Sequence, residues 1–375
     1  MQIDGLTGEV DTYGSVLQRS IRTAITMRSK GITREDIITV CSYNHLNTNI
    51  PIIASLLLGV KTASIDPALA LSDAVHLLKQ VKPKMIFVSE NGIKLIEDTI
   101  KEIGINSELV VFGKTTKHIE FSEFLNEAPE QEREFIPVEI KDLKETFSIF
   151  FSSGTSGLAK GVCLSHRSLI SQFPSKVMEN AIGSISGCRL VLPKFDTDNF
   201  WYLIDKYKVS MLFLPPTLLA TICNNEKPEN VDGSNLKIVM AGGSTIYKEQ
   251  FDIIKQLLPT TIVCSDYGQT ELGGGCLSFS LREVDYLIKK PTSCGKAQPG
   301  YTYKIVDLET EEPLGPNQKG ELRVKTDFYM NGYYNIDSSD SWDSDGFLKT
   351  GDIFYYDEDY CFYVVDRIKD MLILC

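Results

Sequence analysis

Short apolar runs alternate with amphipathic stretches over about residues 10–260. Runs without a polar face predict strands that are buried on both sides of a sheet. Helical periodicity follows several of them, most clearly over residues 49–60, where Asn49 is a predicted N-cap and Pro51 falls in the first turn. This alternation predicts parallel α/β sheets with helices on both faces. The predicted strands lie at residues 37–41, 84–89, 109–112, 147–152, 161–164, 188–192, 211–214 and 236–240.

The pattern changes after about residue 275. Gly, Pro, Tyr and Asp become more frequent, and short alternating segments follow one another at residues 303–306, 321–325, 353–356 and 361–365. Such segments predict an antiparallel β lobe. Residues 113–146 are acidic and rich in loop-forming residues, so we expect them to form a surface excursion.

Composition narrows the classes of function. The chain has 375 residues, a net charge of −12 and a pI near 5.0, which argues against general nucleic-acid binding but not against a local site for ATP. The nine cysteines are odd in number and include no C-x-x-C pair, so we interpret them as reduced core residues. The longest apolar stretch has ten residues, about half of what a bilayer requires, so no integral membrane segment is predicted.

A Ser/Thr/Gly-rich segment at residues 152–161, SSGTSGLAKG, is the strongest candidate for binding chemistry. Its glycines permit backbone geometries in which successive N–H groups converge on one anion, its hydroxyls add donors, and its lysine adds a mobile positive charge. The predicted phosphate-binding residues are Ser152, Ser153, Gly154, Thr155, Ser156, Gly157 and Lys160. The segment is not a Walker A loop, because an apolar run follows Lys160 and predicts a strand–loop–strand setting. The alternative is a flexible surface turn.

This segment resembles the AMP-binding signature of the adenylate-forming superfamily. Within that superfamily it is most similar to insect luciferase-like and 4-coumarate–CoA ligase-like acyl-CoA synthetases. Ser156 stands where Thr is usual, and Ala159 stands where Pro is usual. Further matches follow in the family's order. They are AGGST at 241–245, YGQTE at 267–271, GEL at 320–322 with NGYY at 331–334, KTGD at 349–352 and DRIK at 366–369.

The resemblance implies a role for each matching residue. Gly242, Gly243 and Ser244 would form the adenine-side turn, and Tyr267 would offer a flat face to the adenine. Thr270 would donate to the α-phosphate, Glu271 would hold Mg²⁺, and Lys160 would assist catalysis at the phosphates. Asp352 would accept both ribose hydroxyls, with Arg367 on the other side of the ribose. Taken singly, Tyr267 could be a core residue, Glu271 a solvated helix start and Asp352 a turn residue.

The resemblance also implies the fold, two stacked parallel-sheet αβαβα subdomains with a smaller antiparallel β lobe. We predict a first α/β subdomain, incomplete at its start, over residues 1–145, a second with the phosphate loop over 146–275, the β lobe over 276–365, and a hinge over 366–375. Compared with the family, we expect this chain to lack a segment at its start, a pocket-lining stretch between residues 167 and 187, and the C-terminal domain. The activity of such a shortened chain is therefore in doubt.

The implied function is an acid–thiol ligase that uses ATP, Mg²⁺ and coenzyme A to convert a fatty or aryl carboxylic acid to an acyl-adenylate and then to an acyl-CoA. A luciferase-type monooxygenase and a non-catalytic nucleotide-binding fragment are the alternatives. A full-length parent would be peroxisomal, whereas this chain, which ends in Leu374 and Cys375, would by default be cytoplasmic.

Overall fold

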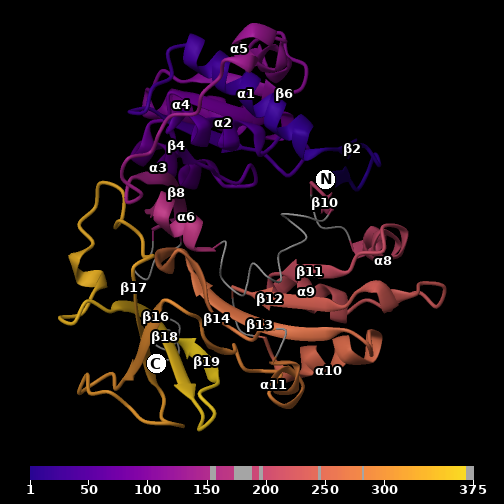
Figure 1. Cartoon of the computed structure of the whole chain (residues 1–375), viewed down its shortest axis with the longest axis vertical. Helices are drawn as coiled ribbons and strands as arrows, with labels where there is room; N and C mark the ends of the chain where they lie inside the picture. Colours follow the sequence, from indigo (N-terminus) through magenta and orange to yellow (C-terminus); the bar gives the residue numbers. More distant parts are fainter. Residues whose placement is uncertain (153–157, 173–187, 194–196, 244–245, 281–282, 369–375) are drawn as a thin grey trace. The chain divides into compact units, whose positions relative to one another are not determined.

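The computed structural model describes residues 1–152, 158–172, 188–193, 197–243, 246–280 and 283–368. The chain divides into two compact units (Figure 1). The first comprises Met1–Arg167, Gly183–Lys194 and Met330–Asp337. The second comprises Ser168–Ile182, Phe195–Tyr329 and Ser338–Cys375. No helix among the described residues is long and apolar enough to cross a membrane.

A seven-stranded sheet with the order β7-β6-β5-β3-β4-β8-β9 is the centre of the first unit. All neighbouring strands in it are parallel except β8 and β9. Its strands are β3 (Ile37–Cys41), β4 (Lys61–Ala63), β5 (Met85–Ser89), β6 (Glu108–Phe112), β7 (Ile119–Glu120), β8 (Thr146–Ser152) and β9 (Lys160–Ser165). Its helices are α1 (Tyr13–Ser29), α2 (Ile50–Leu58), α3 (Leu71–Val81), η1 (Glu90–Gly92), α4 (Ile93–Ile103), η2 (Phe121–Leu125) and α5 (Pro129–Arg133), while α6 (His166–Gln172) spans the division between the units.

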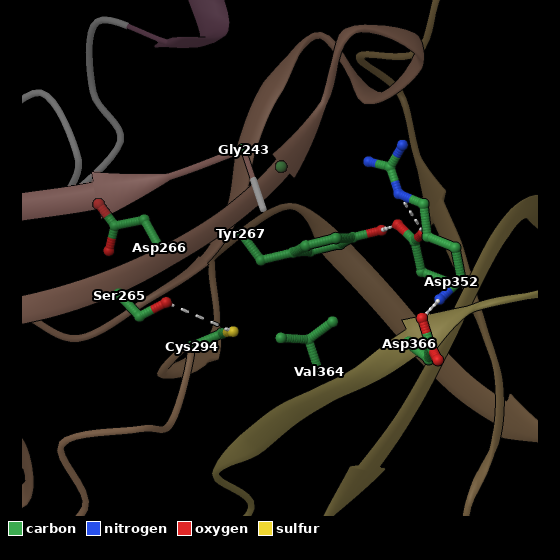
Figure 2. Close-up of a pocket in the computed structure, with 10 residues that line it drawn as sticks. Gly243, Ser265, Asp266, Tyr267, Cys294, Asp352, Val364 and Asp366 are labelled. Atoms are coloured by element: carbon green, nitrogen blue, oxygen red, sulfur yellow. Dashed lines mark hydrogen bonds and ion pairs between the residues drawn. The ribbon is translucent and has the colours of Figure 1, made fainter. Parts of the chain in front are cut away.

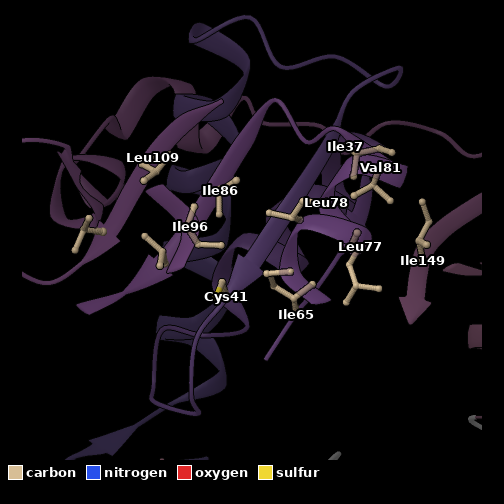
Figure 3. Packing of buried hydrophobic residues seen from close by; sticks show 14 of the residues in the cluster. Ile37, Cys41, Ile65, Leu77, Leu78, Val81, Ile86, Ile96, Leu109 and Ile149 are labelled. Carbon is tan, nitrogen blue, oxygen red and sulfur yellow. The ribbon is translucent and has the colours of Figure 1, made fainter. Parts of the chain in front are cut away.

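Hydrophobic side chains on both faces of this sheet are buried, as the apolar strand pattern predicts. On one face, Ile86 packs in a cluster with Leu78 of α3 and Ile96 of α4 (Figure 3). On the other face, the next residue in β5, Phe87, packs in a second cluster with Met27 of α1. The alternation arises because successive side chains of a strand point to opposite faces. The predicted parallel sheet with helices on both faces is therefore confirmed for this unit.

Two local expectations need adjustment. Helix α2 begins at Ile50 with Pro51 in its first turn, as predicted, but the Asn49 side chain makes no capping hydrogen bond. The expected surface excursion at residues 113–146 is partly buried, because Phe121 and Phe124 are 2% and 0% exposed. Both rings pack edge-on against Phe87, so this acidic stretch is anchored in the core.

The strands on either side of the predicted phosphate loop belong to the first unit. β8 is hydrogen-bonded to β4 in parallel and to β9 in antiparallel orientation, which confirms the predicted strand–loop–strand setting. The predicted subdomain boundary between residues 145 and 146 does not coincide with a sheet boundary. The predicted strand at 188–192 forms β10 (Arg189–Val191), which pairs with β1 (Gln2–Asp4) in a small sheet that also contains β2 (Val10–Asp11).

The second unit contains a five-stranded sheet with the order β11-β12-β13-β14-β15. Its first three strands are parallel, and the long strand β13 continues into antiparallel pairing with β14. The strands are β11 (Met211–Leu214), β12 (Ile238–Gly242), β13 (Ile262–Gln269), β14 (Gly274–Ser278) and β15 (Lys296–Ala297). The helices are α8 (Thr197–Lys206), α9 (Pro216–Cys223), η4 (Gly233–Asn235), α10 (Lys248–Leu257), η5 (Thr270–Leu272), α11 (Val284–Lys289) and η7 (Ser339–Ser341). The strand predicted at residues 236–240 corresponds to β12, which begins two residues later than predicted.

A separate antiparallel sheet with the order β16-β17-β18-β19 completes the second unit. Its strands are β16 (Tyr301–Val306), β17 (Gly320–Thr326), β18 (Leu348–Tyr356) and β19 (Phe362–Arg367). The predicted antiparallel lobe is therefore confirmed. The register of β18 against β19 places Asp352 opposite Arg367, which positions two of the predicted site residues. The fold as a whole is mixed α/β, with parallel sheets and a separate antiparallel sheet.

Candidate functional site

In the first unit, the predicted phosphate loop lies between β8 and β9. Ser152 ends β8, Lys160 begins β9, and the two residues are cross-strand partners. The Lys160 ammonium group lies 4.8 Å from the centre of the Tyr333 ring, within the range of a cation–π interaction. Five predicted loop residues lie outside the described part of the chain, namely Ser153, Gly154, Thr155, Ser156 and Gly157.

Gly161 allows the hairpin to pack closely on its neighbours. A Cβ atom at this position would lie 2.7 Å from the Ile149 side chain and 3.4 Å from that of Tyr334. The Tyr334 amide also donates to the Gly161 carbonyl at 2.7 Å. A side chain at residue 161 would therefore displace the strand that begins with Lys160.

In the second unit, four of the predicted nucleotide-binding residues line one pocket (Figure 2). They are Gly243 after β12, Tyr267 of β13, Asp352 of β18 and Arg367 of β19. The hollow measures about 120 Å³, whereas pockets that enclose a drug-sized ligand are about 300–1,000 Å³. It can therefore hold one part of a nucleotide. The other lining residues are Ser265, Asp266, Gly268, Cys294, Val364 and Asp366.

A buried carboxylate organises this pocket. Asp352 is 3% exposed, and one of its oxygens accepts hydrogen bonds from the Tyr267 hydroxyl and from the Gln269 amide, each at 2.7 Å. Tyr267 and Gln269 are two residues apart on β13, so they point to the same side of the strand. Figure 2 shows the Tyr267 hydroxyl directed at Asp352, with Gly243 beside the same ring. Asp352 lies within strand β18, so the alternative interpretation of it as a turn residue is wrong.

The second oxygen of Asp352 pairs with the Arg367 guanidinium at 3.2 Å. A carboxylate offers about four lone-pair sites, and the three donors just named occupy three of them. Two ribose hydroxyls could both reach Asp352 only if one donor moved. Arg367 is the donor best placed to do so, because its side chain is 43% exposed.

Burial shapes the acid–base behaviour of these groups. Burial raises the pKa of the Asp352 carboxyl above its ordinary value, and the negative charge of Glu271 acts in the same direction. The hydrogen bonds from Tyr267 and Gln269 and the charge of Arg367 oppose this rise. Burial also raises the pKa of the Tyr267 hydroxyl well above 10, with a further contribution from the Asp352 charge. Tyr267 is therefore a neutral donor.

Asp266 is a second buried carboxylate in the lining of the pocket. One of its oxygens accepts a hydrogen bond from the Ser278 hydroxyl at 2.7 Å, and the other is buried without a hydrogen-bond partner. Burial raises the pKa of this carboxyl to about 6, although the Ser278 hydrogen bond works against the rise. Gly242 packs against the backbone of the same residue, since a Cβ atom there would lie 3.0 Å from the Asp266 carbonyl.

Thr270 and Glu271 follow Gln269 directly and form the start of the short helix η5. The negative charge of Glu271 contributes to the raised pKa of the Asp352 carboxyl. Mg²⁺ is usually held by one or two carboxylates together with phosphate oxygens, so the groups present suit such an ion. Ser244, predicted in the adenine-side turn, lies outside the described residues.

Sequence reasoning missed Gln269, Asp266 and the less polar part of the lining, such as Cys294 and Val364. Gln269 could have been found, because it lies two positions after Tyr267 and a strand alternates its faces with period two. Cys294 and Val364 carried no such signal. They reach the pocket through the pairing of residues 295 and 362 and the β18–β19 register.

Residues 6–334 match the family of AMP-binding enzymes. A luciferin 4-monooxygenase of Photuris pensylvanica is 30% identical over 404 residues, which cover 98% of this chain and 73% of that protein. A probable 4-coumarate–CoA ligase 3 of Dictyostelium discoideum is 31% identical over 417 residues, which cover 99% and 74%. The chain therefore belongs to the AMP-binding enzyme family, as the resemblance of its motifs predicts.

A solved structure agrees with this assignment. The luciferase-like enzyme from the nonluminescent mealworm Zophobas morio has 38% sequence identity and a TM-score of 0.90, and the match covers 99% of this chain and 92% of that chain. The similarity thus extends over both units, which confirms the predicted adenylate-forming fold.

Proposed function

We propose that this protein is an ATP-dependent acid–thiol ligase that activates a fatty or aryl carboxylic acid as an acyl-adenylate and then transfers the acyl group to coenzyme A. Membership of the AMP-binding enzyme family supports this function, as does the similarity to a probable 4-coumarate–CoA ligase. The observation that carries the proposal is the pocket that unites Gly243, Tyr267, Asp352 and Arg367. These residues are far apart in sequence, and together they present a ring, a buried carboxylate and a guanidinium group.

Each residue has a role that its chemistry suits. Gly243 and Tyr267 would flank the adenine, and Asp352 would accept hydrogen bonds from the ribose after Arg367 moves. Thr270 would donate a hydrogen bond to the α-phosphate. Adenylation requires the substrate carboxylate to approach this phosphate, and both groups are anions. Catalysis therefore consists mainly of positioning and charge neutralisation. On the phosphate side, Ser152, Lys160 and the predicted loop residues between them would bind the departing pyrophosphate. Glu271 would hold Mg²⁺, which would neutralise phosphate charge.

Isothermal titration calorimetry with ATP and Mg²⁺ tests the binding step on the folded chain. The matched variants are Lys160→Met and Lys141→Met, because Lys141 is an exposed lysine of the same unit. We expect ATP to bind the wild type and Lys141→Met equally, and Lys160→Met about tenfold more weakly, which corresponds to about 1.4 kcal/mol. Absence of ATP binding to the folded wild type would refute the proposal.

A chromatographic assay for acyl-CoA, with a panel of fatty and aryl acids, tests the chemical step. The second candidate is a luciferase-type monooxygenase, which the similarity to the Photuris enzyme favours. Light emission with luciferin and ATP, but no acyl-CoA with any acid, would favour that candidate. We also propose the peroxisomal location that the family resemblance implies, to be tested by imaging of the tagged protein. The absence of nucleic-acid binding stays a prediction.

A further inference from the structure

Two side chains of helix α3 hold the backbone on either side of Lys160. The His76 imidazole Nε2 lies 2.8 Å from the Ala159 carbonyl oxygen. The Gln80 side-chain amide donates to the same carbonyl at 3.2 Å, and its oxygen accepts from the Gly161 N–H at 3.3 Å. Gln80 therefore spans Lys160, with one hydrogen bond to the residue before it and one to the residue after it.

These contacts resemble the pairing that a neighbouring strand would provide. A carboxamide combines one acceptor with a donor group, so it can bond a carbonyl and an amide of the same strand at once. The Ala159 carbonyl has two lone pairs, and His76 and Gln80 together supply two donors for them. The His76 Nε2 also lies 3.1 Å from the Gln80 side-chain nitrogen, so it donates to the Ala159 carbonyl in the tautomer that carries the proton on Nε2. The peptide groups that flank Lys160 are thereby fixed in orientation.

The position of His76 and Gln80 on helix α3 makes this a rigid support. The two residues are four positions apart, so they lie on the same side of the helix, and Gln80 also donates to the His76 carbonyl at 3.3 Å. Four other residues of α3 are buried in the core of the first unit, namely Ala74, Leu77, Leu78 and Val81. The support is therefore attached to the packed sheet through an independent set of contacts.

Other contacts also hold the strand at Lys160. The residue pairs with Ser152 across the hairpin, and its ammonium group lies over the Tyr333 ring. The next residue, Gly161, accepts a hydrogen bond from the Tyr334 amide at 2.7 Å. The long lysine side chain thus starts from a backbone that is fixed on both edges, which reduces the conformational freedom that phosphate binding would have to restrict.

We propose that Gln80, assisted by His76, is a positioning residue that directs Lys160 toward the β- and γ-phosphates of ATP. The inference rests on the proposed function, because it requires Lys160 to contact those phosphates. Neither side chain needs to touch the nucleotide. The effect should therefore be confined to ligands that carry the terminal phosphates, and it should disappear when Lys160 is absent.

Calorimetric titration of the full chain with ATP and, separately, with AMP tests this inference. For Gln80→Leu we expect the Kd of ATP to rise about tenfold, while the Kd of AMP changes less than twofold. Gln80→Glu keeps the acceptor for Gly161 but loses the donor to Ala159, so we expect a smaller rise. The matched control is Lys79→Met, an exposed position on the same helix, where both Kd values should stay within twofold of the wild type.

A double-mutant cycle separates positioning from a general structural effect. In a Lys160→Met background, Gln80→Leu should change the Kd of ATP less than twofold. Equal weakening of ATP and AMP, or a persistent tenfold effect in that background, would overturn the inference. Hydrogen exchange gives a readout without ligand, since the Gly161 amide should exchange about tenfold faster in Gln80→Leu, and an unchanged rate would also overturn it.

The outcome for the wild type distinguishes this inference from the function on which it rests. If the wild type binds ATP and Gln80→Leu binds ATP and AMP in the wild-type ratio, only the positioning role is refuted. If the folded wild type does not bind ATP, the proposed function and the positioning role are both refuted.

Discussion

The β8–β9 hairpin and the pocket around Asp352 hold their polar groups in different ways. The hairpin is fixed by uncharged hydrogen bonds, in which Gln80 and His76 contact the backbone next to Lys160. The pocket is built around two buried carboxylates, Asp352 and Asp266. A neutral hydrogen bond depends mainly on geometry, whereas a buried carboxylate also depends on its charge state. We therefore expect the pocket to be more sensitive than the hairpin to charge-changing substitutions and to pH.

The largest expected effect is that of Asp352→Ala. This change leaves the Tyr267 hydroxyl and the Gln269 amide without their acceptor in a buried site. Hydrogen bonds to charged groups contribute about 1.5–3 kcal/mol each. We expect the free energy of unfolding in urea to fall by about 3 kcal/mol, and the Kd of ATP to rise about 100-fold by calorimetry.

Asp345→Ala is the matched control for that experiment. Asp345 is 69% exposed and pairs with Lys304 at the surface of the same unit. Exposed ion pairs contribute about 0–1 kcal/mol, so the control should behave nearly as the wild type. If both variants weakened ATP binding equally, the pocket around Asp352 would not be the nucleoside site.

The next effect concerns the pH dependence of stability in the second unit. The pKa of Asp266 rises from 3.8 to about 6 because the carboxyl is buried. Between these values the folded chain binds more protons than the unfolded chain, so stability falls as pH rises. Asp266→Asn removes this loss. We expect the variant to gain about 3 kcal/mol over the wild type at pH 7 and only about 1 kcal/mol at pH 4.5. An equal gain at both pH values in urea unfolding would contradict this assignment.

In the first unit, a buried histidine makes stability depend on pH in the opposite direction. The His45 Nδ1 accepts a hydrogen bond from the Asn47 amide at 3.1 Å, so a second ring proton would face a donor. Burial lowers the pKa of His45 to about 4, although the charge of Asp4 opposes this. The unfolded chain therefore binds more protons between pH 4 and 6.5, and this contribution to stability is lost as pH falls through that window.

The variant His45→Gln tests whether His45 causes this pH dependence, which is opposite in sign to that assigned to Asp266. We expect the wild type to lose about 2 kcal/mol of stability relative to the variant when the pH falls from 7 to 4.5. Urea unfolding at the two pH values measures it. If the difference between wild type and His45→Gln did not change with pH, the buried neutral histidine would not be the cause.

The smallest expected effect is that of Arg367→Ala at the rim of the pocket. Its side chain is 43% exposed, and its pair with Asp352 is 3.2 Å long. We expect the Kd of ATP to rise about fivefold, or about 1 kcal/mol, because the arginine contact with the ribose is lost. Inorganic pyrophosphate, which has no ribose, is the control ligand, and its Kd should not change. An equal loss of affinity for pyrophosphate would contradict the distinction between the two regions.

Much of the fold could be predicted because the strands of the two parallel sheets are short and apolar. Ile37–Cys41, Met85–Ser89 and Met211–Leu214 appear where the pattern predicts them, since a strand buried on both faces has a strong local signature. The depth of Phe121 and Phe124 could not be predicted. Their burial depends on a ring contact with Phe87, more than thirty residues earlier in the chain.

The sequence by itself determined which residues could carry the chemistry. The motifs occur in the order that is typical of the adenylate-forming family. They contain Lys160, Tyr267 and Asp352, which supply a cation, an aromatic ring and a carboxylate. The tertiary structure alone decided how these residues are supported. Gln80 reaches the hairpin, and Gln269 reaches Asp352, through contacts across 79 and 83 positions of the chain. Such contacts depend on strand register and helix packing, which local sequence patterns do not encode.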